Sequence, residues 1–210
     1  LRDLLIAIYL GSGPIADAFF VAFRIPNTFR RLFSEGTFNA AFVPSYSSEM
    51  LLGKIRSQNF ANKIFNLLLI GLFLIVLIIE IFMPSFVFII APGFSDNSDK
   101  IDLTIFLTRI TFPFLLFVSL SSFFSAILNS HNKFAAASAA PIILNIFLIL
   151  VLLFQSYLND QLVIYLSYAV TFAGIIQLIF LLFFIRKFYF PKIIFKFKID
   201  KKVKLFFNKL

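Results

Sequence analysis

The segment Asp17–Glu35, "DAFFVAFRIPNTFRRLFSE", combines the apolar residues of a membrane helix with five charged side chains and a proline. Because each helical residue advances by about 100°, most of its polar side chains share one stripe roughly 60° wide. The stripe contains Asp17, Arg24, Thr28, Arg31 and Glu35. A charge at the bilayer centre costs roughly 2.5–3.5 kcal/mol. Charges on a membrane helix are therefore taken by default to mark the path of a substrate or an ion. We therefore interpret this segment as a two-sided helix that walls a hydrated cavity.

The composition of the whole chain indicates an integral membrane protein. Of its 210 residues, 60% are hydrophobic and 14% are charged, whereas soluble domains average about 45–50% and about 25%. The apolar runs are continuous, which favours helices over the alternating strands of a β-barrel. The chain has no cysteine, which excludes disulfides, thiol nucleophiles and cysteine-ligated metals.

The apolar runs predict an all-α, polytopic bundle of about six transmembrane helices, the first of them truncated. We expect the helices at residues 1–10, 16–33, 60–90, 101–129, 136–154 and 162–185. Residues 1–190 would form one transmembrane lobe, and residues 191–210 a basic cytoplasmic linker. Pro113 predicts a kink in the fourth helix. The less apolar stretch 36–62 is expected to be a cytoplasmic loop with a short interfacial helix.

The basic residues fall on alternate connections of this bundle. The net charge is +9, and nine of the 19 Lys and Arg residues follow Ile185. By the positive-inside rule the first helix ends outside and the C-terminal tail is cytoplasmic. We interpret the basic tail as a solvated segment beside anionic lipid, not as a nucleic-acid site.

The stretch Gly11–Pro44, "GSGPIADAFFVAFRIPNTFRRLFSEGTFNAAFVP", closely resembles the signature of the MurJ (MviN) family of bacterial lipid II flippases. Three later stretches, at Ala91–Phe94, Thr111–Ser130 and Ala140–Ile146, resemble the same family. The resemblance implies the fold of the MOP-superfamily (MATE-like) exporters, in which two lobes enclose a central cavity. This chain is similar to the N-terminal lobe, and the missing C-terminal lobe would be its partner.

The resemblance also implies a function. Such proteins are flippases, not enzymes, and carry lipid II, a polyprenyl-pyrophosphate glycopeptide, to the outer leaflet of the bacterial cytoplasmic membrane. The implied process is peptidoglycan synthesis, and with it cell-wall formation and cell shape. The implied mechanism is alternating access. We expect no cofactor, although a coupling ion is left open, and we expect lipid II and membrane lipids as partners.

The candidate site residues fall into three groups. Arginine grips phosphate with paired hydrogen bonds, so the substrate-binding candidates are Arg2, Arg24, Arg30 and Arg31. The candidates for cavity or gating roles are Asp3, Asp17, Thr28 and Glu35. The hinge candidates are Gly11, Gly13, Pro14, Pro26 and Gly36.

Simpler roles are open for several of these residues. Arg30 and Arg31 could reach the cytoplasmic interface as topology anchors. Asp17 could cap its helix, and the glycines and prolines could only shape turns.

Other functions have weaker support in the sequence. A flippase for another polyprenyl-pyrophosphate-linked glycan would need the same arginines, whereas a MATE-like drug antiporter would need acidic cavity residues. A membrane enzyme would need a cluster of catalytic side chains. His131 is the only histidine and is expected to be solvated, and the acidic run from Asp96 to Asp102 is expected to cap a helix.

Overall fold

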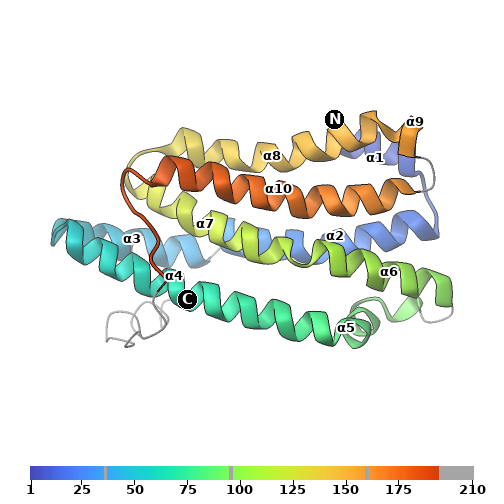
Figure 1. Ribbon diagram of the computed structural model, residues 1–210, viewed down its shortest axis with the longest axis horizontal. Helices are drawn as coiled ribbons and strands as arrows, with labels where there is room; N and C mark the ends of the chain where they lie inside the picture. The colour runs from blue at the N-terminus through green and yellow to red at the C-terminus, as the bar shows by residue number, and fades with distance from the viewer. Residues whose placement is uncertain (36, 95–96, 159–160, 194–210) are drawn as a thin grey trace.

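In the computed structural model, long helices run nearly along the longest axis of the molecule (Figure 1). The structure describes residues 1–35, 37–94, 97–158 and 161–193, except the side chains of 29–35, 37, 156 and 158. The helices are α1 Arg2–Leu10, α2 Pro14–Glu35, α3 Thr37–Leu51, α4 Lys54–Ile81, α5 Met83–Ile90, η1 Pro92–Phe94, α6 Ser98–Thr111, α7 Phe114–Ser130, α8 Phe134–Leu153, α9 Gln155–Leu158 and α10 Leu162–Ile185. The expected all-α fold is confirmed.

Four segments of the described chain are long and apolar enough to cross a membrane. They are Lys54–Ile81, Ser98–Ser130, Phe134–Leu153 and Leu162–Ile185. A bilayer core about 30 Å thick needs roughly 20 apolar residues, and α1 has only nine. The α2 helix has 22 residues but is not among the four, because its charged side chains interrupt the apolar sequence. The composition of the described residues therefore supports four clear spans, fewer than the six expected.

Two of the expected helices are broken near a proline. The segment expected at 60–90 begins earlier, at Lys54, and is divided at Phe82 into α4 and α5. Pro84 lies in the first turn of α5, where its missing N–H leaves no hydrogen bond unmade. The segment expected at 101–129 is likewise divided between α6 and α7, at Phe112 and the predicted kink residue Pro113.

The stretch 36–62, expected to be mainly a loop, is largely helical. It contains the 15 residues of α3 and the beginning of α4, joined by a short turn. Gly53 in this turn has φ +117°, a conformation that side chains on an L-residue disfavour. The turn brings α3 back against α4, and both helices pack on α7.

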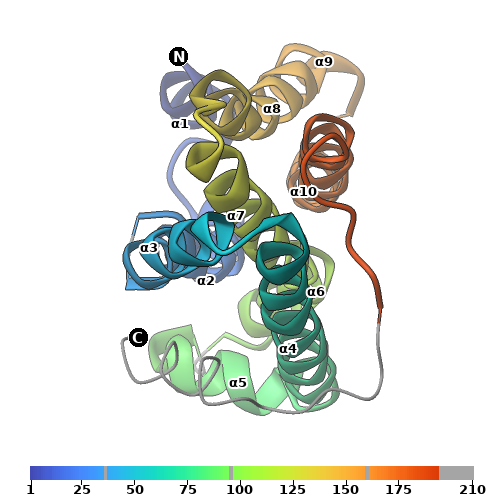
Figure 2. The same cartoon turned by 90° about the vertical axis from the view of Figure 1, so that its left-hand side faces the viewer.

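The central helix is α7, which contacts α2, α3, α4, α8 and α10 (Figure 2). Its buried Phe123 contacts the rings of Phe38, Phe42 and Phe65 from α3 and α4. A second buried cluster joins residues of α1, α2, α6, α7, α8 and α10. The phenylalanine-rich composition thus supplies a core within the bundle as well as an apolar exterior.

The connections of the bundle separate by charge. The α3–α4 turn, the α7–α8 turn and the end of α10 lie at one end of the molecule, and the α1–α2 turn lies at the other (Figure 1). The exposed basic residues at or beside the first group of connections are Lys54, Arg56, Lys133, Arg186 and Lys187. One end of the molecule is therefore strongly basic.

Candidate functional site

Arg2 is held in place by two neighbours at the beginning of α1. Its Nε and Nη2 atoms donate to Asp3 Oδ1 at 2.8 and 2.6 Å, and its Nη1 donates to Asn145 Oδ1 on α8 at 3.0 Å. The Arg2 side chain is 26% exposed, whereas the Asp3 side chain is 81% exposed. A guanidinium group carries five N–H donors, so two remain for a ligand among the described contacts.

The turn between α1 and α2 contains three of the hinge candidates. Gly11 has φ +62° and ψ −147°, a backbone conformation that only glycine adopts readily. Gly13 has open space where a Cβ would stand, and Pro14 is the first residue of α2. Pro26 lies inside α2, where it removes one hydrogen bond of the helix. These positions permit bending, but their role as hinges stays a prediction.

Asp17 lies in the first turn of α2 and pairs with a lysine from α6. Lys100 Nζ is 2.7 Å from Asp17 Oδ2 and also lies 3.8 Å from the centre of the Phe94 ring. The helix begins three residues earlier, at Pro14, so Asp17 is not its cap. A carboxylate in the first turn is still stabilised by the helix dipole, and the ion pair joins α2 to α6.

Arg24 and Thr28 line a hollow of about 360 Å³ together with Val21, Ile25 and Ile90. Both side chains are exposed, and Thr28 Oγ1 donates to the Arg24 carbonyl at 2.8 Å. The hollow lies between α2 and α5, on the face that carries Asp17. The described part of the charged stripe is therefore accessible.

The remaining members of the predicted site lie outside the described residues. They are the side chains of Arg30, Arg31 and Glu35, and Gly36 as a whole. Among the described members, Arg2 contacts α8 and Arg24 lies beside α5, so these two arginines have different neighbours. The grouping of all four arginines in one cavity stays a prediction.

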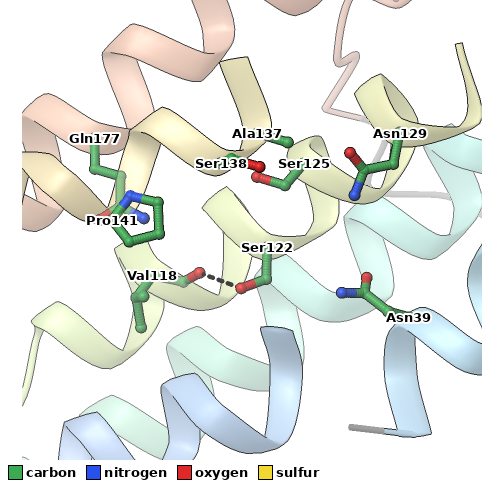
Figure 3. Close-up of a pocket in the computed structure, with 9 residues that line it drawn as sticks. All are labelled: Asn39, Val118, Ser122, Ser125, Asn129, Ala137, Ser138, Pro141 and Gln177. Carbon is green, nitrogen blue, oxygen red and sulfur yellow. Dashed lines mark hydrogen bonds between the residues drawn. The ribbon is translucent and has the colours of Figure 1, made fainter. Parts of the chain in front are cut away.

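A polar pocket that the sequence did not predict lies among α3, α7, α8 and α10 (Figure 3). Its volume is about 140 Å³. The polar residues that line it are Asn39, Ser122, Ser125, Asn129, Ser138 and Gln177. Val118, Ala137 and Pro141 form its apolar wall. We call it the neutral pocket, because none of the described side chains that line it is charged.

The signal for this pocket in the sequence is weak. Ser122, Ser125 and Asn129 recur at helical spacing on α7, but Ser residues on membrane helices commonly donate to their own backbone. Ser122 does so, with its Oγ 3.0 Å from the Val118 carbonyl. The contributions from α3 and α10 depend on tertiary packing, so they are not visible in any single segment.

A second unpredicted feature joins α4 to the segment that follows α10. Three side-chain amides on α4, four residues apart and so on one face, form what we call the amide row: Gln58, Asn62 and Asn66. The first and last amides donate to the carbonyls of Phe188 and Lys192 at 3.1 and 2.8 Å. The middle carbonyl accepts from Tyr189 Oη at 2.6 Å and from the Lys192 N–H at 3.1 Å. The amide row thus fixes the course of the chain after α10.

His131 is not solvated, as the sequence suggested, but half-buried in the α7–α8 turn. Its ring stacks on Phe188 at a centroid distance of 4.4 Å, and Nε2 lies 3.3 Å from Tyr46 Oη. Burial lowers the pKa of His131 and raises the pKa of Tyr46. The short C-terminal segment and α3 enclose this histidine, and neither lies near it in sequence.

The described residues contain no cluster of three or more His, Asp or Glu side chains that could hold a metal ion. The acidic run overlaps the beginning of α6 and has a structural role in part, because Asn97 within it caps the helix by accepting from the Lys100 N–H at 3.0 Å. Among the described residues, Arg2, Arg24 and the neutral pocket are therefore the candidates for holding a ligand.

Four apolar spanning segments of the described chain, together with the charged helices α1 and α2 and the neutral pocket, are typical of a multi-pass membrane protein of the transporter type. The family model for the lipid II flippase MurJ matches residues 6–210, so the chain belongs to that family, and the predicted resemblance is confirmed. The family consists of transporters, not enzymes.

Relatives agree with this assignment. The probable lipid II flippase MurJ of Rickettsia prowazekii is 42% identical over 187 residues, covering 89% of this chain and 36% of the relative. The protein of the same name from Rhizobium tropici is 45% identical over 182 residues, covering 84% and 34%. A solved structure of lipid II flippase MurJ in an inward closed conformation superposes with a TM-score of 0.77 at 29% identity, covering 99% of this chain and 43% of that one. The chain spans just over a third of the length of these curated relatives.

Proposed function

We propose that this chain is the N-terminal lobe of a lipid II flippase, which moves the lipid-linked peptidoglycan precursor from the inner to the outer leaflet. The missing C-terminal lobe would complete the cavity, and alternating access would rock one lobe against the other. The arginines Arg2, Arg24, Arg30 and Arg31 would hold the pyrophosphate while the polyprenyl tail stays in lipid. Asp3, Asp17, Thr28 and Glu35 would balance the charge or gate the cavity.

The proposal depends above all on the orientation and the free N–H donors of the Arg2 guanidinium group. Its guanidinium group is oriented by Asp3 and Asn145 and keeps two N–H donors uncommitted among the described contacts. A preoriented guanidinium loses little conformational entropy when it binds, and its donors match the oxygens of a phosphate. The exposure of Arg24 beside its hollow is consistent with the same chemistry.

The proposed location is the bacterial cytoplasmic membrane, with the basic end of the bundle in the cytoplasm. The exposed lysines and arginines beside the α3–α4 and α7–α8 turns and after α10 support this orientation, because cytoplasmic loops carry an excess of Lys and Arg. The tail after α10 would then be cytoplasmic and would lead to the second lobe.

The test uses the full-length parent protein in bacterial cells depleted of their own lipid II flippase. We expect Arg2→Ala to abolish growth support, because it removes both the charge and the free donors, and Arg2→Lys to restore it only in part. Membrane accumulation of each variant is measured by immunoblot as the control. If Arg2→Ala supports normal growth, Arg2 has no role in holding the substrate.

The outcome for the unmodified parent separates the alternatives. Growth support by the parent establishes lipid II as cargo. If the parent accumulates in the membrane but does not support growth, the cargo is another polyprenyl-pyrophosphate-linked glycan or a drug-like cation, as for a MATE-like antiporter.

A further inference from the structure

We infer that the neutral pocket binds an uncharged, hydroxyl- or amide-bearing part of the cargo, namely the sugar that adjoins the pyrophosphate. This inference rests on the proposed function, because it assigns a second part of the same cargo to a second place on the lobe. The pocket is the one lined by Asn39, Ser122, Ser125, Asn129, Ser138 and Gln177.

The first support is the unused hydrogen-bonding capacity of the lining. Gln177 is only 5% exposed, yet its Oε1 atom has no hydrogen-bond partner among the described residues. A buried polar atom without a partner costs about 1–3 kcal/mol, so a ligand that donates to it recovers this cost. Ser125 and Ser138, on facing helices, also have hydroxyl groups that make no hydrogen bond within the described chain.

The second support is the chemistry of the lining. Amides and hydroxyls supply both donors and acceptors, and the described polar side chains of the lining carry no formal charge. A phosphate would need cationic partners, and a divalent cation would need carboxylates. A sugar ring presents hydroxyl groups at its rim and C–H groups on its face, and the latter suit Val118, Ala137 and Pro141. The volume of about 140 Å³ suits one such group and not a whole glycopeptide.

The third support is the position of the pocket relative to Arg2. Ser138 and Pro141 line the pocket, and Asn145, which anchors Arg2, follows at helical spacing on the same face of α8. Seven residues of helix separate Ser138 from Asn145, a rise of about 10 Å. A pyrophosphate held at Arg2 would therefore have its next covalent group within reach of the pocket. The exposed Ser138 and the buried Gln177 show that the pocket extends inward from the surface.

The experiment compares two lipid probes on the purified full-length parent in detergent: lipid II and the corresponding polyprenyl diphosphate without sugar. We expect Gln177→Met and the double variant Ser125→Ala/Ser138→Ala each to weaken the binding of lipid II about tenfold, because each removes one or two hydrogen bonds. Binding of the sugar-free probe is expected to stay unchanged. Ser130→Ala on α7, which lies outside the pocket and only loses a bond to its own helix, is the matched control.

The outcomes separate the two proposals. If Arg2→Ala weakens both probes while the pocket variants weaken neither, the pocket assignment is overturned and the proposed function stands. If the parent binds neither probe, the pocket assignment and the proposed function are both wrong. If Gln177→Met instead removes a sodium-dependent rise in melting temperature without changing lipid binding, the pocket is a cation site and the inference is wrong. Melting temperatures without ligand show whether each variant is folded.

Discussion

Gly174 lies where α10 packs tightly against α7. A Cβ at this position would lie 2.6 Å from Phe114 Cδ2 and 3.2 Å from Phe117 Cβ. Phe114 is fully buried, so its ring has little space to move, and cores that are overpacked in this way lose stability. A single glycine thus sets the spacing of two membrane helices.

We expect Gly174→Ala to destabilise the protein by about 1–3 kcal/mol, measured as a lower melting temperature in detergent. The matched control is Gly71→Ala on α4, where nothing lies within 4 Å of the added Cβ. An exchange at that helical site is expected to be neutral or stabilising, since alanine favours helix. Equal effects at the two positions would refute the packing explanation.

Arg31 belongs to the stripe on α2 that the sequence alone predicts. We expect Arg31→Ala in the full-length parent to abolish growth support in flippase-depleted cells while the protein still accumulates, because the proposed mechanism needs this cationic group to hold the pyrophosphate. Growth and immunoblots are the measurements. Normal growth would remove Arg31 from the mechanism and favour its simpler role as an interfacial anchor.

His131 makes stability depend on pH. Burial lowers its pKa in the folded state, so the unfolded chain takes up a proton near the ordinary histidine pKa of about 6.5 while the folded chain remains neutral. The contribution of His131 to stability is therefore fully present above that value and is lost as the pH falls toward the lower folded pKa. Lys54 and Lys187 line the hollow of about 290 Å³ beside this ring.

We expect the melting temperature of the parent to fall between pH 7.5 and pH 5.5, and His131→Gln to reduce this fall. The comparison of slopes, not of absolute melting temperatures, is the measurement, because the substitution also removes the stacking on Phe188. An unchanged slope would show that other groups govern the pH dependence.

Among the elements, α4 has two halves with different roles. Its outer half is exposed and apolar, with Phe73, Leu74 and Leu77 available to lipid, while its first turns present the amide row to the segment after α10. We expect Asn62→Leu to leave Tyr189 Oη and the Lys192 N–H without their acceptor and to free this segment. Trypsin should then cleave after Arg186, Lys187 and Lys192 several-fold faster than in the parent.

The matched control for the amide row is Asn59→Leu, because Asn59 is exposed on the same turn of α4 and has no hydrogen bond to the segment. Its cleavage rate should equal that of the parent. If Asn62→Leu leaves the rate unchanged as well, the hydrogen bonds do not hold the segment in solution.

The sequence predicted the elements far better than it predicted their contacts. Long apolar runs decide the helices, because a membrane helix satisfies its own backbone hydrogen bonds, and α10 lies at 162–185 as expected. The break at Phe82 was missed because Pro84 is compatible with both a kinked and an interrupted helix. The neutral pocket and the amide row were missed because each needs residues more than 80 positions apart.

For the whole molecule, the separation of charge between the two ends predicts one orientation in the membrane. The chain contains no cysteine, so single cysteines can report on each end in a cysteine-free version of the full-length parent. We expect a membrane-impermeant maleimide to label Asp99→Cys in intact cells. Lys133→Cys, exposed at the opposite end, should react only after lysis.

Two labelling patterns would contradict this topology. Labelling of Lys133→Cys but not Asp99→Cys in intact cells would invert the orientation, and labelling of both would place the two turns on one side. Either result would remove the positive-inside support for a cytoplasmic tail.

The hydrogen bonds between α4 and residues 188–192 have a mechanical consequence. A pull on the chain at Ile193 is transmitted first to Asn66 and Asn62, and only afterwards to the end of α10. A displacement of the chain after Ile193 would thus tilt α4. The helical hairpin that α4 forms with α3 would move with it as one rigid unit.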